Sequence, residues 1–134
     1  MTITVIRDLS LPMRHIVHVR HHLISTDASP DEGGDDAGPS PHDLYDAALA
    51  SCKALTVLWY AKRKAIPVEH VEVRTERDAS DERAGVYRLA ATLHLGGPLD
   101  QAQREALLAA AAKCPIHKLM TGVTTEVRTV LAEP

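Results

Sequence analysis

The chain of 134 residues has almost no aromatic side chains. It contains no Phe, one Trp and three Tyr, although 45% of its residues are hydrophobic. A chain of this length is normally one domain, and such a domain buries roughly two-thirds of the surface that its unfolded form exposes. We therefore predict a single domain over residues 1–134, with a core built from aliphatic side chains and alanine.

The chain also lacks an excess of positive charge, a long apolar run and the pattern of a signal peptide. The 15 Lys and Arg are outnumbered by 18 Asp and Glu, so no cationic surface is expected to neutralise a nucleic acid. The longest stretch without Asp, Glu, Lys or Arg is Leu89–Leu99, whereas a membrane-spanning helix needs about 20 apolar residues. The N-terminus lacks the basic and apolar regions of a signal peptide. We expect a cytoplasmic protein with no nucleic-acid or membrane partner.

What the chain does contain predicts an α+β fold with antiparallel strands in the order ββαββααβ. Strands are expected around residues 3–5, 16–19, 68–76, 89–95 and 123–131, and helices over 41–64, 101–113 and 115–120. The segment Asp27–Pro39 is rich in Gly, Pro and carboxylates and is predicted to be a solvated acidic loop. Ser40 is the expected N-cap of the first helix, and Asp100 with Gln103 resembles a capping box.

The helix expected over 41–64 is apolar on nearly every side. Even the face that carries Asp46 and Lys53 also carries Ala50 and Val57. At 1.5 Å per residue the helix is about 36 Å long, and a helix that is apolar all round is buried on most sides. One small domain has difficulty covering it, so we expect a second subunit to contribute.

The chain has two cysteines, Cys52 and Cys114, too few for a disulfide framework or a four-cysteine zinc site. They are either buried small hydrophobes or a reactive pair. Cys114 precedes Pro115 at the expected start of a short helix, whose free N–H groups and dipole favour a thiolate. His117 lies one turn further on and, as an imidazolium, would favour the thiolate more. Alternatively, Cys114 only packs where two helices join.

A metal site is the other chemistry that the residues suggest. The chain has eight His, and the spacing from Cys114 to His117 is one that can hold two zinc ligands. No second ligand pair has that spacing, however. His15, His18, His21 and His22 alternate along a strand and would not all converge. We therefore expect no metal and no other cofactor.

Three segments resemble the OsmC/Ohr family, in its branch of OsmC-like redox proteins. They are G-P-S-P-x-D-L at 38–44, A-A-L-A-S-C-x-A-L-T at 47–56 and K-C-P-I-H-K-L at 113–119. The resemblance covers nearly the whole chain. It implies an intertwined, swapped homodimer, in which each subunit contributes strands to an antiparallel sheet around two long central helices.

The resemblance also implies a thiol-dependent peroxidase that reduces organic hydroperoxides in oxidative-stress defence, without metal or flavin. Cys52 would be the peroxidatic thiolate and would become a sulfenic acid. Cys114 would resolve it as a disulfide, which a small dithiol or a thioredoxin-type reductant reopens.

In the family, an arginine of the N-terminal hairpin and a glutamate ten residues before the first cysteine support the thiolate. Here that position is His42, and the nearest carboxylate is Asp43, which could equally be a helix cap. Arg7, Arg14 and Arg20 all lie in the hairpin region, and Arg20, just before His21 and His22, is the candidate among them. Because the glutamate is missing, an alternative is a non-catalytic family member that binds a small apolar ligand at the dimer interface. A metal-binding stress protein is a third hypothesis.

Overall fold

The computed structural model describes residues 1–134, which fold as two compact units, Met1–Ala48 and Leu49–Pro134. The long helix α1 (Pro41–Arg63) runs from the first unit into the second. The predicted α+β class with antiparallel strands is confirmed, while the single domain stays a prediction. No helix combines the length and the apolar character that crossing a membrane requires.

The first unit contains a three-stranded antiparallel sheet of β1 (Ile3–Arg7), β2 (His15–Val19) and β3 (His22–Thr26). The predicted hairpin is the β1–β2 pair, in which Val5 lies opposite Val17. The strand β3 was not among the predicted strands. Its turn contains Arg20 with a positive φ of 54° rather than the Gly or Asn that normally signals a tight hairpin.

The acidic loop after β3 is organised around the carboxylate of Asp27, which is only 4% exposed. This carboxylate accepts backbone N–H groups of Ala28 at 2.8 Å, Asp35 at 3.1 Å and Ala37 at 3.0 Å. These bonds, that of Ala37 above all, lower the pKa of Asp27. Gly34 is required because a Cβ there would collide with the Ala28 carbonyl. The segment is therefore more ordered than the plain solvated loop predicted from its composition.

The start of α1 confirms the predicted cap. The backbone N–H of Asp43 donates to Oγ of Ser40 at 3.1 Å, and the backbone N–H of Ser40 donates to Oδ2 of Asp43 at 2.9 Å. This reciprocal pair satisfies two N–H groups that a helix N-terminus leaves free. Asp43 therefore serves as a helix cap.

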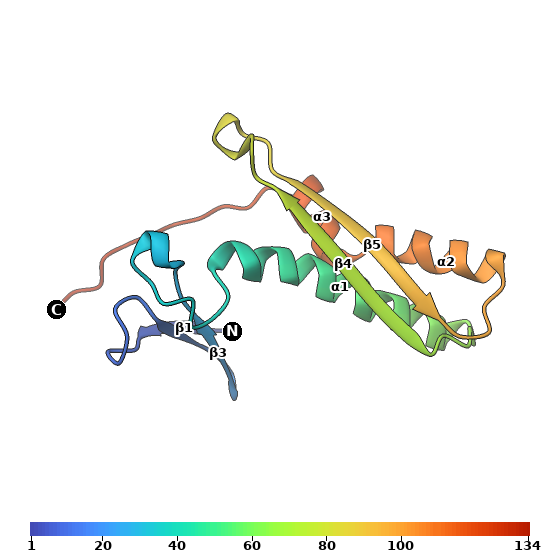
Figure 1. Cartoon of the computed structure of the whole chain (residues 1–134), viewed down its shortest axis with the longest axis horizontal. Coiled ribbons are helices and arrows are strands. Elements are labelled where there is room, and N and C mark those ends of the chain that lie inside the picture. The colour runs from blue at the N-terminus through green and yellow to red at the C-terminus, as the bar shows by residue number, and fades with distance from the viewer. The chain divides into compact units, whose positions relative to one another are not determined.

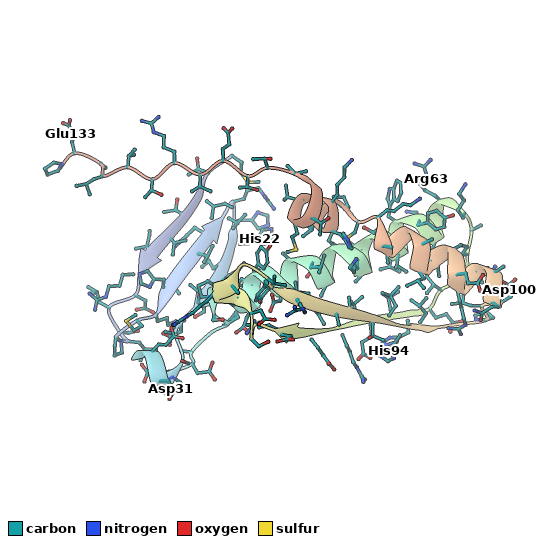
Figure 2. The ribbon with its side chains drawn as sticks, turned by 90° about the horizontal axis from the view of Figure 1, so that it is seen from above. His22, Asp31, Arg63, His94, Asp100 and Glu133 are labelled. Atoms are coloured by element: carbon teal, nitrogen blue, oxygen red, sulfur yellow. The ribbon has the colours of Figure 1, made fainter.

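The second unit packs the C-terminal part of α1 and α2 (Gln101–Ala112) against one face of a hairpin (Figure 1). The hairpin consists of β4 (His70–Asp78) and β5 (Arg88–Gly96). The core of the second unit is formed by aliphatic and alanine side chains of the two helices: Val57, Ala61, Leu107 and Ala111. The hairpin adds partly buried residues, whereas His94 points away from the helices (Figure 2). The aliphatic core expected from the composition is thus present in this unit.

The last helix, α3 (Pro115–Gly122), is followed by a segment without secondary structure. The strand predicted over 123–131 is therefore not formed, and the element order is βββαββαα. The chain runs on as an extended trace past Glu133 to its C-terminus (Figure 2), and Leu131 is 98% exposed. The alternating pattern is present, but a strand also needs a neighbouring backbone to pair with, and this segment pairs with none.

Candidate active site

The two cysteines are free thiols at the point where α1 meets the beginning of α3. Cys52 lies on α1 and is partly exposed, while Cys114 is the N-cap residue of α3 and is buried completely. The backbone N–H of Ile116 donates to Sγ of Cys52 at 3.5 Å, across 64 positions of sequence. Since Ile116 follows Cys114 by two residues, this contact brings the Cys52 sulfur to the chain segment that carries Cys114.

The sequence around Pro115 explains why an N–H group is free at this place. Pro115 has no N–H, suits the first position of a helix, and disfavours the helical conformation in the residue before it. Cys114 accordingly has extended backbone angles, φ −63° and ψ 148°. Ile116 then carries the first N–H of α3, at the positive end of the helix dipole, where a negative charge is favoured.

The structure thus confirms that Cys114 is an N-cap but changes which sulfur the helix faces. The Cys114 side chain makes no capping hydrogen bond. The N–H of Ile116 points instead at Cys52, the sulfur on the other helix. The sequence motif identified the free helix N-terminus, but only the tertiary structure shows that its donor serves Cys52.

Lys53 is a buried cation beside the cysteines that the sequence analysis did not single out. It is 6% exposed, and its Nζ lies 3.0 Å from the Ala111 carbonyl and 3.0 Å from Nδ1 of His117. An ammonium group has donors only, so Lys53 is the donor and Nδ1 of His117 the acceptor in this contact. His117, named from the sequence as a possible support of the Cys114 thiolate, thus contacts Lys53, and its effect on the thiolate stays a prediction. The available signal was a lysine in the middle of a mostly apolar helix, next to Cys52.

The other two residues named from the sequence, Arg20 and Asp43, belong to the first unit. Within that unit, the guanidinium of Arg20 contacts Sδ of Met1 at 3.9 Å, and Asp43 caps α1. Their part in the chemistry of Cys52 stays a prediction.

Two further features bear on the alternative hypotheses of a metal-binding protein and of a protein that binds an apolar ligand. No group of three or more His, Cys, Asp and Glu side chains is arranged to hold a metal ion. An open groove of about 360 Å³ lies between β5 and α2, lined mainly by Leu93, Leu95, Arg104 and Leu108. Neither cysteine lines this groove, so the site of Cys52 and Cys114 is a separate feature of the second unit.

Comparison with known proteins places this geometry in a family. The family model described as OsmC-like protein matches residues 33–128. No curated protein matches the chain. Among solved structures, the OsmC-like protein of Mycoplasma pneumoniae is 19% identical, with a TM-score of 0.72, over 91% of this chain and 87% of the other.

Two structures whose names refer to organic hydroperoxide resistance also share the fold. The protein OsmC from Legionella pneumophila is 22% identical with a TM-score of 0.62, over 91% of this chain and 90% of the other. The protein OhrB of Bacillus subtilis is 22% identical with a TM-score of 0.58, over 91% of this chain and 92% of the other. At these identities the likeness shows a common fold. Because the family model covers more than half of its length, the chain belongs to the OsmC-like family.

Proposed function

We propose that this protein reduces organic hydroperoxides in oxidative-stress defence, with Cys52 as the peroxidatic and Cys114 as the resolving cysteine. The observation that carries the proposal is the hydrogen bond from the N–H of Ile116 to the Cys52 sulfur. It gives Cys52 a donor at a helix N-terminus, a setting that favours a thiolate. The resemblance in fold to two proteins named for organic hydroperoxide resistance supports the same function.

The reaction balances with the two cysteines alone. The Cys52 thiolate attacks an oxygen of the hydroperoxide, the O–O bond breaks, and the alkoxide takes up a proton and leaves as an alcohol. Cys52 is then a sulfenic acid. The Cys114 thiol attacks this sulfur, the S–S bond forms, and the hydroxyl group leaves as water with the thiol proton. The two sulfurs together supply the two electrons that reduce the peroxide.

An external reductant must then reopen the disulfide between Cys52 and Cys114. We propose that it is a small dithiol or a thioredoxin-type protein. Exchange begins with attack of a thiolate on one accessible sulfur. Cys52 is partly exposed whereas Cys114 is buried, so the reductant attacks Cys52 and releases Cys114. The proposed location is the cytoplasm, where reducing conditions keep such thiols free. Arg20 stays the candidate for an additional cation at Cys52.

We also propose that the active form is a homodimer. On α1, Leu55 is 67% and Trp59 is 60% exposed, and the segment 123–134 has an apolar alternation without a partner. Large apolar side chains exposed together on one helix are typical of an interaction surface. A second copy of the chain covers both features in the swapped arrangement that the family resemblance implies.

The test is the reaction of the reduced protein with one equivalent of cumene hydroperoxide. The expected products are the alcohol and a protein that has lost two hydrogen atoms by mass, and dithiothreitol restores the original mass. Cys114→Ser should stop at a sulfenic acid that dimedone traps, and Cys52→Ser should consume no peroxide. Two free thiols in the treated wild-type protein would contradict the proposal and favour the non-catalytic binder of an apolar ligand.

A further inference from the structure

The buried ammonium group of Lys53 is unexpected at this place in a small α+β unit. Moving a charged group out of water is unfavourable. A protein with an apolar side chain of similar volume at the same place is often at least as stable. The two contacts of Lys53 are a backbone carbonyl and an imidazole nitrogen, and neither is a carboxylate. Stability alone therefore gives a poor reason for a lysine here, and its contacts suggest a different one.

The two residues that Lys53 contacts lie on either side of Cys114 along the sequence. Ala111 precedes Cys114 by three residues and His117 follows it by three. The Ala111 carbonyl also accepts the backbone N–H of Cys114, at 3.3 Å, so the lysine and the cysteine share one acceptor at the end of α2. The side chain of Lys53 thus bridges the end of α2 and the first turn of α3.

Lys53 is also the residue that follows Cys52 on α1. The anchor of the bridge and the sulfur that receives the N–H of Ile116 therefore belong to adjacent residues of one rigid helix. A shift of α3 away from Cys52 lengthens the hydrogen bond between Lys53 and His117. The same three segments carry both the bridge and the thiol site.

We propose that Lys53 and His117 are positioning residues that clamp Cys114 and the α3 N-terminus beside Cys52. This inference deepens the proposed function and rests on it. Disulfide formation needs Cα atoms within about 7 Å and a narrow geometry, and a displacement of about 1 Å can slow a positioned reaction about 100-fold. The clamp therefore acts mainly on the resolving step, in which Cys114 must reach the Cys52 sulfenic acid.

Four variants test the clamp. Lys53→Met removes the ammonium group and keeps the length of the side chain, and His117→Leu removes the acceptor. His117→Asn restores an acceptor, because Oδ1 of asparagine lies as far from Cβ in bonds as Nδ1 of histidine. Lys62→Met is the matched control, since Lys62 is an exposed lysine on the same helix.

The first measurement is the rate at which iodoacetamide alkylates Cys114 in the folded, reduced protein, followed by peptide mass spectrometry. We expect Lys53→Met and His117→Leu to raise this rate roughly tenfold or more, because each removes a hydrogen bond that involves a charged group. His117→Asn and Lys62→Met should stay close to wild type. Equal rates in all four variants, or no rescue by asparagine compared with leucine, would overturn the clamp.

The second measurement separates the two chemical steps after mixing with cumene hydroperoxide. We expect Lys53→Met to slow disulfide formation roughly 10- to 100-fold while sulfenic acid formation, trapped with dimedone, changes much less. Equal slowing of both steps would overturn the positioning role. Alkylation needs no peroxide, so a wild-type protein that is inert to peroxide contradicts the proposed function, whereas unchanged Cys114 reactivity contradicts the clamp. If Lys53→Met fails to fold, the two His117 variants decide.

Discussion

Asp27 holds the loop between β3 and α1 together through its buried carboxylate. Replacing it by Asn should lower the melting temperature by several degrees at neutral pH, because the charged acceptor of three backbone N–H groups is lost. The pKa of Asp27 is lowered in the folded protein from its usual value of 3.8. Its stabilisation is therefore complete well above pH 3.8 and is lost as the pH falls through the lower folded value.

Melting curves of the wild type and Asp27→Asn across a pH series check this prediction. The difference in melting temperature should be constant above about pH 5 and should shrink below the usual carboxylate pKa of 3.8. Asp35→Asn is the control, because only the backbone N–H of Asp35 bonds to Asp27. A difference that grows in acid would contradict this role of the Asp27 carboxylate.

Among the polar contacts of single residues, the sequence predicts those between residues a few positions apart. Ser40 with Asp43 and Asp100 with Gln103 are pairs three residues apart, and both caps are present. The contact between Lys53 and His117 spans 64 positions, so no local spacing announces it. A hydrophobic pattern identifies the residues of a buried face, but it does not say which distant acceptor a buried charge will find.

Among the elements, α2 contributes the largest fully buried side chain of the second unit, Leu107. Leu107→Ala should reduce the free energy of unfolding by about 2–5 kcal/mol, since the contacts of a buried side chain are lost and a cavity is left. Leu108→Ala removes the same atoms from the adjacent position, where the side chain is mostly exposed, and should change the stability by no more than about 0.5 kcal/mol. Urea denaturation measures both, and similar effects would argue against this core.

The elements also show where local signals suffice. The three helices begin at the predicted residues because caps and prolines mark their starts within a few positions. Strands depend on a partner, and the chain departs from expectation at two of them. The strand β3 formed because β2 offers an edge to pair with, and the segment 123–131 remained unpaired although its alternation is regular.

For the whole molecule, the proposed homodimer explains why an alternating segment and an apolar helix face stay exposed in one chain. The cysteine motifs of the candidate site are local and were recognised in the sequence. The surroundings of each thiol, like the partner of an exposed segment, depend on distant parts of the structure. The hydrogen bond between the Ile116 N–H and the Cys52 sulfur depends on a tertiary contact across 64 positions of sequence.

The C-terminal segment provides a test of the dimer that uses its own alternation. If residues 123–131 pair as a strand with a second copy, Val127 faces the apolar side and Glu126 the solvent. Val127→Lys should then weaken the dimer at least about tenfold, because an unpaired charge is buried in the interface, and Glu126→Lys should leave it intact. Sedimentation velocity over a dilution series measures both variants against wild type. A monomeric wild type, or equal behaviour of the two lysine variants, would contradict the paired strand.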